Sequence, residues 1–298
     1  MSVSTRTWLL NGLPLNRPGQ YFVEADTASP GSPAPRVAVT QVPGLDGAAV
    51  NARPRLEIAE VGFRIAVEDC DDRGRSGGYA QRRVNEASIK RQLAGTLIRP
   101  GVLTLVEENT RRQFTRRETQ AILNSEIAVE ELTESFAVLS FTWLLPEPVW
   151  VEPSKRMVEL RPDKNGVCLL AKLTGGSAMM WPLWALRGPA QRVEIVCTVS
   201  GSRTVWIGDV QAGQVLLLDP KRWAWGVASE GVWPWKKDRP EWGAVLTGSQ
   251  AAFDDAGGLS PDWLGRYSAT ITINGHPLPV PSGEVPVGGL CLGQRSFL

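Results

Sequence analysis

The spacing of apolar residues constrains the fold of this chain most, because only one segment has the period of a helix. From Tyr79 to Ile98 apolar side chains recur at helical spacing, and Pro100-Gly101 follows as a stop signal. Elsewhere apolar and polar residues alternate, as in 63–67 and 193–199, which is the period of half-buried strands. The sequence therefore predicts a mainly β fold, all-β with one helix in the first domain.

The first domain is expected to span residues 1–150 as a β-barrel-like sheet with the helix packed on it. Ile127 to Leu132 and Phe136 to Leu144 are β-prone, and the second is apolar on both faces and is predicted to be a central strand. Gly62 is a candidate β-bulge. On the helix, the expected buried face contains Ala80, Val84, Ala87, Leu93, Ala94, Leu97 and Ile98. Arg82, Arg83, Glu86 and Lys90 are placed largely opposite to it.

The second domain, residues 151–298, is expected after a break of prolines at 146, 148 and 153. Short alternating segments separated by turns, from Val193 to Asp219, indicate a β-sandwich. Asn274-Gly275 is a strong two-residue hairpin signal near its end. Between them lies a tryptophan-rich insertion of about 221–264, which is expected to be irregular.

The composition predicts no metal, no cofactor and no membrane insertion. The chain has 298 residues, a net charge of +1 and no apolar run of the length that a membrane span needs. Its start lacks the apolar core of a secretory signal, so we expect no export by the ordinary route. The four cysteines are scattered and there is one histidine, His276. Reduced, buried thiols are the expected state of these cysteines.

Three short patterns suggest chemistry, and each has a plainer interpretation. Residues 74–78 match the Gly-x-Ser-x-Gly nucleophile elbow, but His276 is the sole candidate base and one helix cannot build the α/β fold of such hydrolases. A glycine-rich connector is the favoured interpretation. Asp69, Asp71 and Asp72, and likewise Asp254-Asp255, lack the further ligands of a calcium loop, so solvated loops are favoured. A pair of glycosidase carboxylates has no sequence signature and stays open.

Two clusters are candidate contact surfaces. The first cluster consists of four arginines around one aromatic residue and could bind nucleic acid or a neighbouring subunit. Its members are Arg111, Arg112, Phe114, Arg116 and Arg117. A subunit interface is favoured, since one aromatic ring is not a stacking platform for bases. The second cluster is Trp223, Trp225, Trp233 and Trp235. These rings could contact a partner protein or a glycan, or form a satellite core beneath a long loop, whereas Trp206 is expected in the main core.

A motif near the start gives these features a context. Trp8, Asn11 and Gly12 are followed by Val42, Gly44, Asp46 and Gly47, and then by the strands, helix and second β domain described above. This order resembles the distal tail proteins of long-tailed phages. Residues 213–219 are similar to a strand of the galectin-like domain in that family, so the resemblance implies a galectin-like second domain.

The resemblance implies a structural virion protein rather than an enzyme. Six copies would form a hexameric ring through their first domains, as a baseplate hub that joins the tail tube protein to tail-tip hub and fibre proteins. DNA would pass through the lumen as transient cargo. The expected location is the tail tip of the virion, after assembly in the host cytoplasm. Two alternatives stay open: a carbohydrate-binding module and, with less support, a tail-associated glycosidase or esterase.

Overall fold

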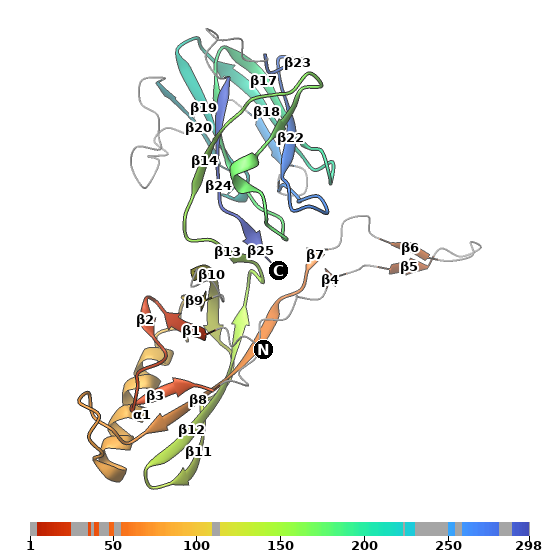
Figure 1. The fold of residues 1–298 in the computed structure, drawn as a ribbon. Helices are drawn as coiled ribbons and strands as arrows, with labels where there is room; N and C mark the ends of the chain where they lie inside the picture. Colours follow the sequence, from red (N-terminus) through yellow and green to blue (C-terminus); the bar gives the residue numbers. More distant parts are fainter. Residues whose placement is uncertain are drawn as a thin grey trace. The chain divides into compact units, whose positions relative to one another are not determined.

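The structure is a computed structural model that divides the chain into two compact units (Figure 1). The first unit comprises Met1–Pro153 with Leu298, and the second comprises Ser154–Phe297. The structure describes residues 5–24, 35–36, 39–41, 48–50, 55–108, 114–222, 224–229, 250–253, 258–279 and 288–297.

The first unit is built on one curled antiparallel sheet with the strand order β2-β1-β9-β10-β12-β8-β3 (Figure 1). Two further strands lie beside this path, β11 next to β12 and β13 next to β10. The strands are β1 (Thr5–Leu10), β2 (Leu13–Pro14), β3 (Tyr21–Val23), β8 (Ala59–Glu68), β9 (Gly101–Glu108), β10 (Phe114–Leu123), β11 (Ala128–Thr133), β12 (Phe136–Leu145) and β13 (Trp150–Val151). Two short ribbons pair β4 (Pro35–Arg36) with β7 (Arg55–Leu56) and β5 (Val39–Gln41) with β6 (Ala48–Val50). The predicted β fold is confirmed.

The central strand is β12, as its apolar pattern predicts. It pairs residue for residue with β8, from Ala59 opposite Leu145 to Glu68 opposite Phe136. Gly62 takes part in this unbroken ladder opposite Thr142, so the predicted bulge is wrong. A Cβ atom at this glycine would meet no other atom within 4 Å, and the residue is accommodated as an ordinary strand position.

Aromatic side chains from several strands form much of the core of the first unit. Phe63 of β8 stands edge-on to Trp8 of β1, with 4.9 Å between ring centroids, and stacks with Phe141 at 5.9 Å. Trp143 meets Phe141 edge to face at 5.3 Å, and Trp150 lies 5.9 Å from Trp8. Ring contacts of this kind add to the burial of large apolar area. They tie the first strand of the chain to the central pair.

The helix α1 (Gly78–Ala94) is present, but of the residues expected on its buried face only Leu93 is buried. Its buried residues are Arg82, Asn85, Glu86, Ile89 and Leu93. Val84 is 61% exposed and Ile98, beyond the end of the helix, is 95% exposed. The buried residues also follow helical spacing, so the periodicity alone could not select between two faces. The helix ends at Ala94, where the backbone and hydroxyl groups of Thr96 both donate to the carbonyl of Leu93.

The second unit is a two-layer sandwich. One sheet has the order β14-β24-β16-β19-β20 and the other the order β15-β22-β17-β18-β21, with β23 next to β22. The strands of the first are β14 (Arg156–Glu159), β24 (Gly289–Gly293), β16 (Leu183–Arg187), β19 (Gln214–Asp219) and β20 (Ala224–Ser229). Those of the second are β15 (Val167–Leu169), β22 (Ser268–Ile273), β17 (Ala190–Cys197), β18 (Arg203–Val210), β21 (Gln250–Phe253) and β23 (His276–Pro277). The other described elements of the unit are the short helices η1 (Ala171–Leu173) and η2 (Pro220–Arg222) and the strand β25 (Ser296–Phe297).

One apolar cluster fills the space between these two sheets. It includes Trp184, Leu216, Leu218 and Cys291 from one sheet and Val193, Ile195, Trp206, Ala269 and Ile271 from the other. The hairpin at Asn274-Gly275 is confirmed, because both residues have left-handed φ angles, 52° and 82°. The insertion that was expected to be irregular contains two strands of the sandwich, β20 and β21. The ladder between β20 and β19 orders its first part.

The cysteines are free thiols, and Cys168, Cys197 and Cys291 are buried. Burial raises the pKa of Cys168 to about 12 and also raises the pKa of Cys291. Cys70 is only half-buried; burial and then the carboxylates of Asp69, Glu68 and Asp71 raise its pKa too. Thiolate formation is therefore suppressed at all three of these positions, since a raised pKa leaves the neutral thiol at pH 7.

Native thiol labelling tests this arrangement. We expect an alkylating reagent at pH 7 to modify Cys70 and to spare the three buried cysteines. The reaction of Cys70 should be slow, because its raised pKa leaves little thiolate at this pH. All four should react after denaturation. Mass spectrometry of the peptides measures each site, and rapid labelling of Cys168 or Cys291 in the folded protein would contradict the packing of the second unit.

Candidate functional site

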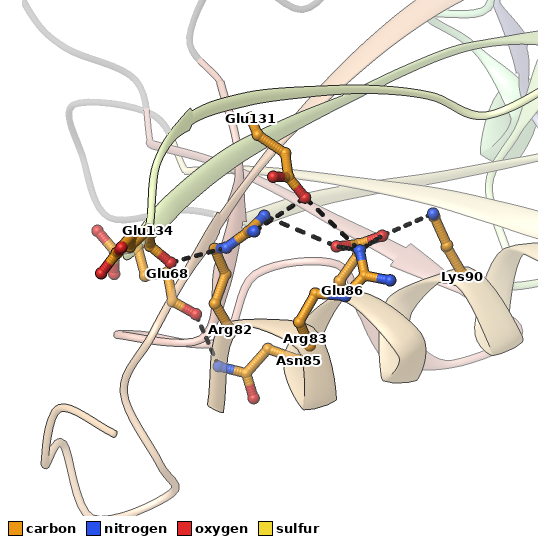
Figure 2. A network of polar contacts seen from close by, with 8 residues as sticks. All are labelled: Glu68, Arg82, Arg83, Asn85, Glu86, Lys90, Glu131 and Glu134. Carbon is orange, nitrogen blue, oxygen red and sulfur yellow. Dashed lines mark hydrogen bonds and ion pairs between the residues drawn. The ribbon is translucent and has the colours of Figure 1, made fainter. Parts of the chain in front are cut away.

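A charge network with Arg82 and Glu86 buried at its centre joins α1 to β11 and to the turn that follows it (Figure 2). The Arg82 side chain is fully buried, and its Nε donates a hydrogen bond of 2.9 Å to the backbone oxygen of Glu134. Its terminal nitrogens form ion pairs with Glu131, at 3.0 Å, and with Glu86, at 3.7 Å. Contact with Arg82, and more weakly the charge of Arg83, lowers the pKa of the Glu131 carboxyl. The guanidinium of one residue thus fixes the helix to the neighbouring hairpin.

Glu86 is the second centre of this network. Its carboxylate is buried, and it lies 2.7 Å from Lys90 Nζ and 3.0 Å from an Arg83 nitrogen. Beside it, Asn85 Nδ2 donates to the backbone oxygens of Glu68 and Cys70, at 2.8 and 2.9 Å. Buried charges are tolerated where opposite charges and hydrogen bonds compensate their desolvation. The helix therefore docks on the end of β8 through a polar face.

The hairpin held by this network presents an edge strand. In the described part of the chain β11 pairs with β12 alone, and all six of its residues are exposed. An edge strand offers unpaired backbone groups to another strand. Its side chains and flanks are acidic, with Glu126, Glu130 and Glu134 exposed. This surface, called the β11 edge below, combines an open backbone edge with negative charge.

The arginine cluster lies on the β9–β10 hairpin, of which the structure describes the strands. Phe114 stands opposite Glu108 at the start of β10 and is 68% exposed. Arg116 points to the same strand face as Glu118 and pairs with it at 2.8 Å. Arg117 is half-buried. Arg111 and Arg112 lie outside the described residues. Within the described part, the charge of Arg116 is compensated inside its own strand, whereas Phe114 is an apolar ring open to solvent.

The first half of the N-terminal motif has a clear structural role. Asn11 and Gly12 both have left-handed φ angles, 52° and 80°, and form the turn between β1 and β2. The Asn11 side-chain oxygen accepts a hydrogen bond of 2.8 Å from the Val102 backbone, which ties the turn to β9. Trp8 belongs to the aromatic core. Val42, Gly44, Asp46 and Gly47 lie outside the described residues.

The Gly-x-Ser-x-Gly segment connects β8 to α1. Ser76 Oγ donates a 2.7 Å hydrogen bond to the Asp69 carboxylate, which also accepts from the Gly78 backbone. These contacts, that of Ser76 first, lower the pKa of Asp69. The strand before the segment pairs antiparallel on both sides, unlike the parallel strand that precedes a nucleophile elbow. Ser76 thus acts as a link within the connector.

The Asp71 loop belongs to the first unit and the single histidine, His276, to the second. The Asp71 carboxylate accepts hydrogen bonds from the backbone groups of Arg73 and Arg75 in its own loop. His276 is exposed in β23, next to the Asn274-Gly275 turn. Asp254 and Asp255 lie outside the described residues.

Within the described ranges there is no group of three or more His, Cys, Asp or Glu side chains that could hold a metal ion. The same part of the chain has no helix long and apolar enough to cross a membrane.

The described tryptophans of the second unit separate into two kinds. Trp206 is fully buried, as expected, and Trp225 packs against it with 6.0 Å between ring centroids. Trp225 therefore extends the core. Trp263 is 88% exposed. The residues around it in the sequence have no helical or strand period from which this exposure could be predicted. Trp223, Trp233 and Trp235 lie outside the described residues.

A comparison with solved structures relates the whole chain to a phage protein. It matches the crystal structure of the Dit protein (gp 19.1) of phage SPP1, described as a paradigm of the hub adsorption apparatus in phages that infect Gram-positive bacteria. The match has a TM-score of 0.57 and 11% identity, and it covers 99% of this chain and 100% of that chain. No family model and no curated protein gives a significant match. At this identity the likeness shows a shared fold.

Substitution of Arg82 tests the buried network. Arg82→Met should lower the free energy of unfolding of the first unit by about 3 kcal/mol, because it removes the hydrogen bond to the Glu134 backbone oxygen and the fully buried cation that pairs with Glu131 and Glu86. Arg83→Met, at the next position of the same helix but half-exposed, should cost less than about 1 kcal/mol. Denaturant unfolding of the full chain measures both, and equal losses for the two variants would contradict the network.

Proposed function

We propose that this protein is a structural component of a phage tail, a distal tail protein that forms the hub at the tail tip. The observation that carries the proposal is the match to SPP1 Dit over essentially the full length of both chains. A likeness confined to one unit would fit any common β fold, whereas this match spans both units of the chain. The motif of Trp8, Asn11 and Gly12 supports the same family, although its second half is outside the described residues.

The first units are proposed to close a hexameric ring. A ring built from identical heterologous contacts uses two different surfaces of each copy. The two surfaces that we propose are the β11 edge of one copy and the β9–β10 hairpin of the next. The acidic residues of the first would meet Arg111, Arg112, Arg116 and Arg117 of the second, with Phe114 at the contact. Such an interface would cover an exposed strand edge, which is otherwise a site of uncontrolled association.

The proposed partners follow from the position of such a hub. The ring would bind the tail tube protein on one side and tail-tip hub and fibre proteins on the other, with a lumen through which DNA passes. The galectin-like second units would provide further contact surfaces. Assembly would take place in the host cytoplasm and the mature protein would be located at the tail tip of the virion.

The described residues give the other two functions less support. A glycan platform at the tryptophan-rich insertion would need its rings exposed, and Trp225 packs instead on Trp206. An esterase would need an activated serine, and the Ser76 hydroxyl donates to Asp69. We therefore assign no catalytic residues.

The mass and shape of the purified protein test the proposal. We expect light scattering and negative-stain imaging to show a six-fold ring, either for the protein alone or after addition of the remaining tail proteins. A chain that stays monomeric and never joins tail particles would contradict the hub function.

A pair of variants tests the proposed contact. Phe114→Glu should prevent ring formation, because it places a charge beside an acidic surface. Val199→Glu is the matched control, since Val199 is an exposed apolar residue of the second unit, 47% exposed against 68% for Phe114. A ring that forms equally well with Phe114→Glu would exclude the β9–β10 hairpin as the contact.

A further inference from the structure

A five-residue turn in the second unit, closed by its own hydrogen bonds, displays two apolar side chains. In residues 262–266 the Asp262 carboxylate accepts hydrogen bonds of 2.9 Å from the backbone groups of Leu264 and Arg266, and one of 2.7 Å from Arg266 Nε. The backbone closes the turn with bonds from Asp262 to Arg266 and from Gly265 to Asp262. Gly265 has a φ of 71°, which requires glycine in practice. The turn is thus fixed by its first, fourth and fifth residues.

The same turn occurs at two other places in the chain. Each begins with an aspartate whose Oδ1 accepts from the backbone groups two and four residues later, and each has a left-handed glycine at its fourth position. The backbone bonds that close the turn are also the same. These turns are residues 71–75, with Asp71 and Gly74, and residues 163–167, with Asp163 and Gly166.

The second and third residues of the turn are its tip, and they differ in character. The tips of the other two turns are Asp72-Arg73 and Lys164-Asn165, which are polar and exposed. The third turn has Trp263, 88% exposed, and Leu264, 47% exposed. The turn geometry therefore does not require apolar residues at its tip. Burial of the exposed apolar surface of Trp263 and Leu264 against a partner would be favourable by the hydrophobic effect.

We propose that Trp263 and Leu264 form a docking element that inserts into an apolar pocket of another tail protein. Tryptophan is enriched among the residues that dominate protein interfaces, and a preformed turn reduces the entropy lost on binding. The Asp262 carboxylate and the Arg266 guanidinium, which flank the tip, form an ion pair at 2.7 Å. The opposite charges beside the tip therefore neutralise each other. A sugar would need polar groups with free bonding capacity around the ring, whereas the Asp262 oxygens are engaged by the turn itself.

The inference rests on the proposed function, because the partner is taken to be another tail protein. The test uses the full chain with the double substitution Trp263→Lys and Leu264→Asn, which gives this turn the tip of the turn at 163–167. The control is Lys164→Ala, at the equivalent tip position of that turn. Each chain is mixed with the remaining tail proteins, and its ring formation and its incorporation into tail particles are measured separately. Hydroxyl-radical oxidation of Trp263 is measured in the free chain and in the particle, with buried Trp206 as internal reference.

We expect the double variant to fold and to form the same ring as the wild type, but to enter tail particles about tenfold less well or worse. The control should behave as the wild type, and Trp263 should be oxidised in the free chain and protected in the particle. Normal incorporation of the double variant with Trp263 still oxidised would overturn this inference and leave the hub function standing. A wild-type chain that never enters particles would overturn both. Protection of Trp263 by host cell-wall polysaccharide alone would identify a sugar ligand and contradict a protein partner.

Discussion

The ladder between β8 and β12 is the interaction on which the first unit depends. It pairs every residue from Ala59 to Glu68 without interruption, and it places Phe63 next to Phe141 in the aromatic core. At its other end it brings the backbone oxygens of Glu68 and Cys70 to the side chain of Asn85, so the same ladder receives the helix. The outer side of β12 is shared between β10 and β11, which leaves β11 with one paired edge in the described residues. The strand edge that we propose as a ring contact thus results from this arrangement of strands around β12.

The sequence predicted strands well where apolar and polar residues alternate, and it predicted the location of the helix. It placed β12 at the centre because that strand is apolar on both faces, and the turn at Asn274-Gly275 because two successive residues favour left-handed backbone. It could not predict the orientation of α1. Arg82 and Glu86 are buried because Glu131, Arg83 and Lys90 compensate their charges, and such compensation depends on residues far apart in the sequence. Hydropathy alone assigns such residues to the solvent.

At the candidate contact surfaces, too, the sequence identified residues whose contacts depend on tertiary structure. Phe114 was identified as part of an arginine cluster, yet Arg116 is paired with Glu118 in its own strand, which no count of charges could show. Trp225 belongs to the core, whereas Trp263 is exposed, and the two are distinguished by tertiary packing. The Asp-x-x-Gly spacing of the three equivalent turns is visible in the sequence, but such spacings are common, and only the repeated hydrogen bonds show that they form one structure.

The central claim is that the open edge of β11 is covered when the protein assembles as a tail hub. Amide hydrogen exchange tests it most directly, because backbone groups that point away from β12 exchange freely until another chain pairs with them. The account predicts that exchange in Ala128–Thr133 slows in the assembled ring relative to the monomer, while exchange in the exposed turn at 163–167 is unchanged. Equal exchange of β11 in the monomer and in the ring would contradict it.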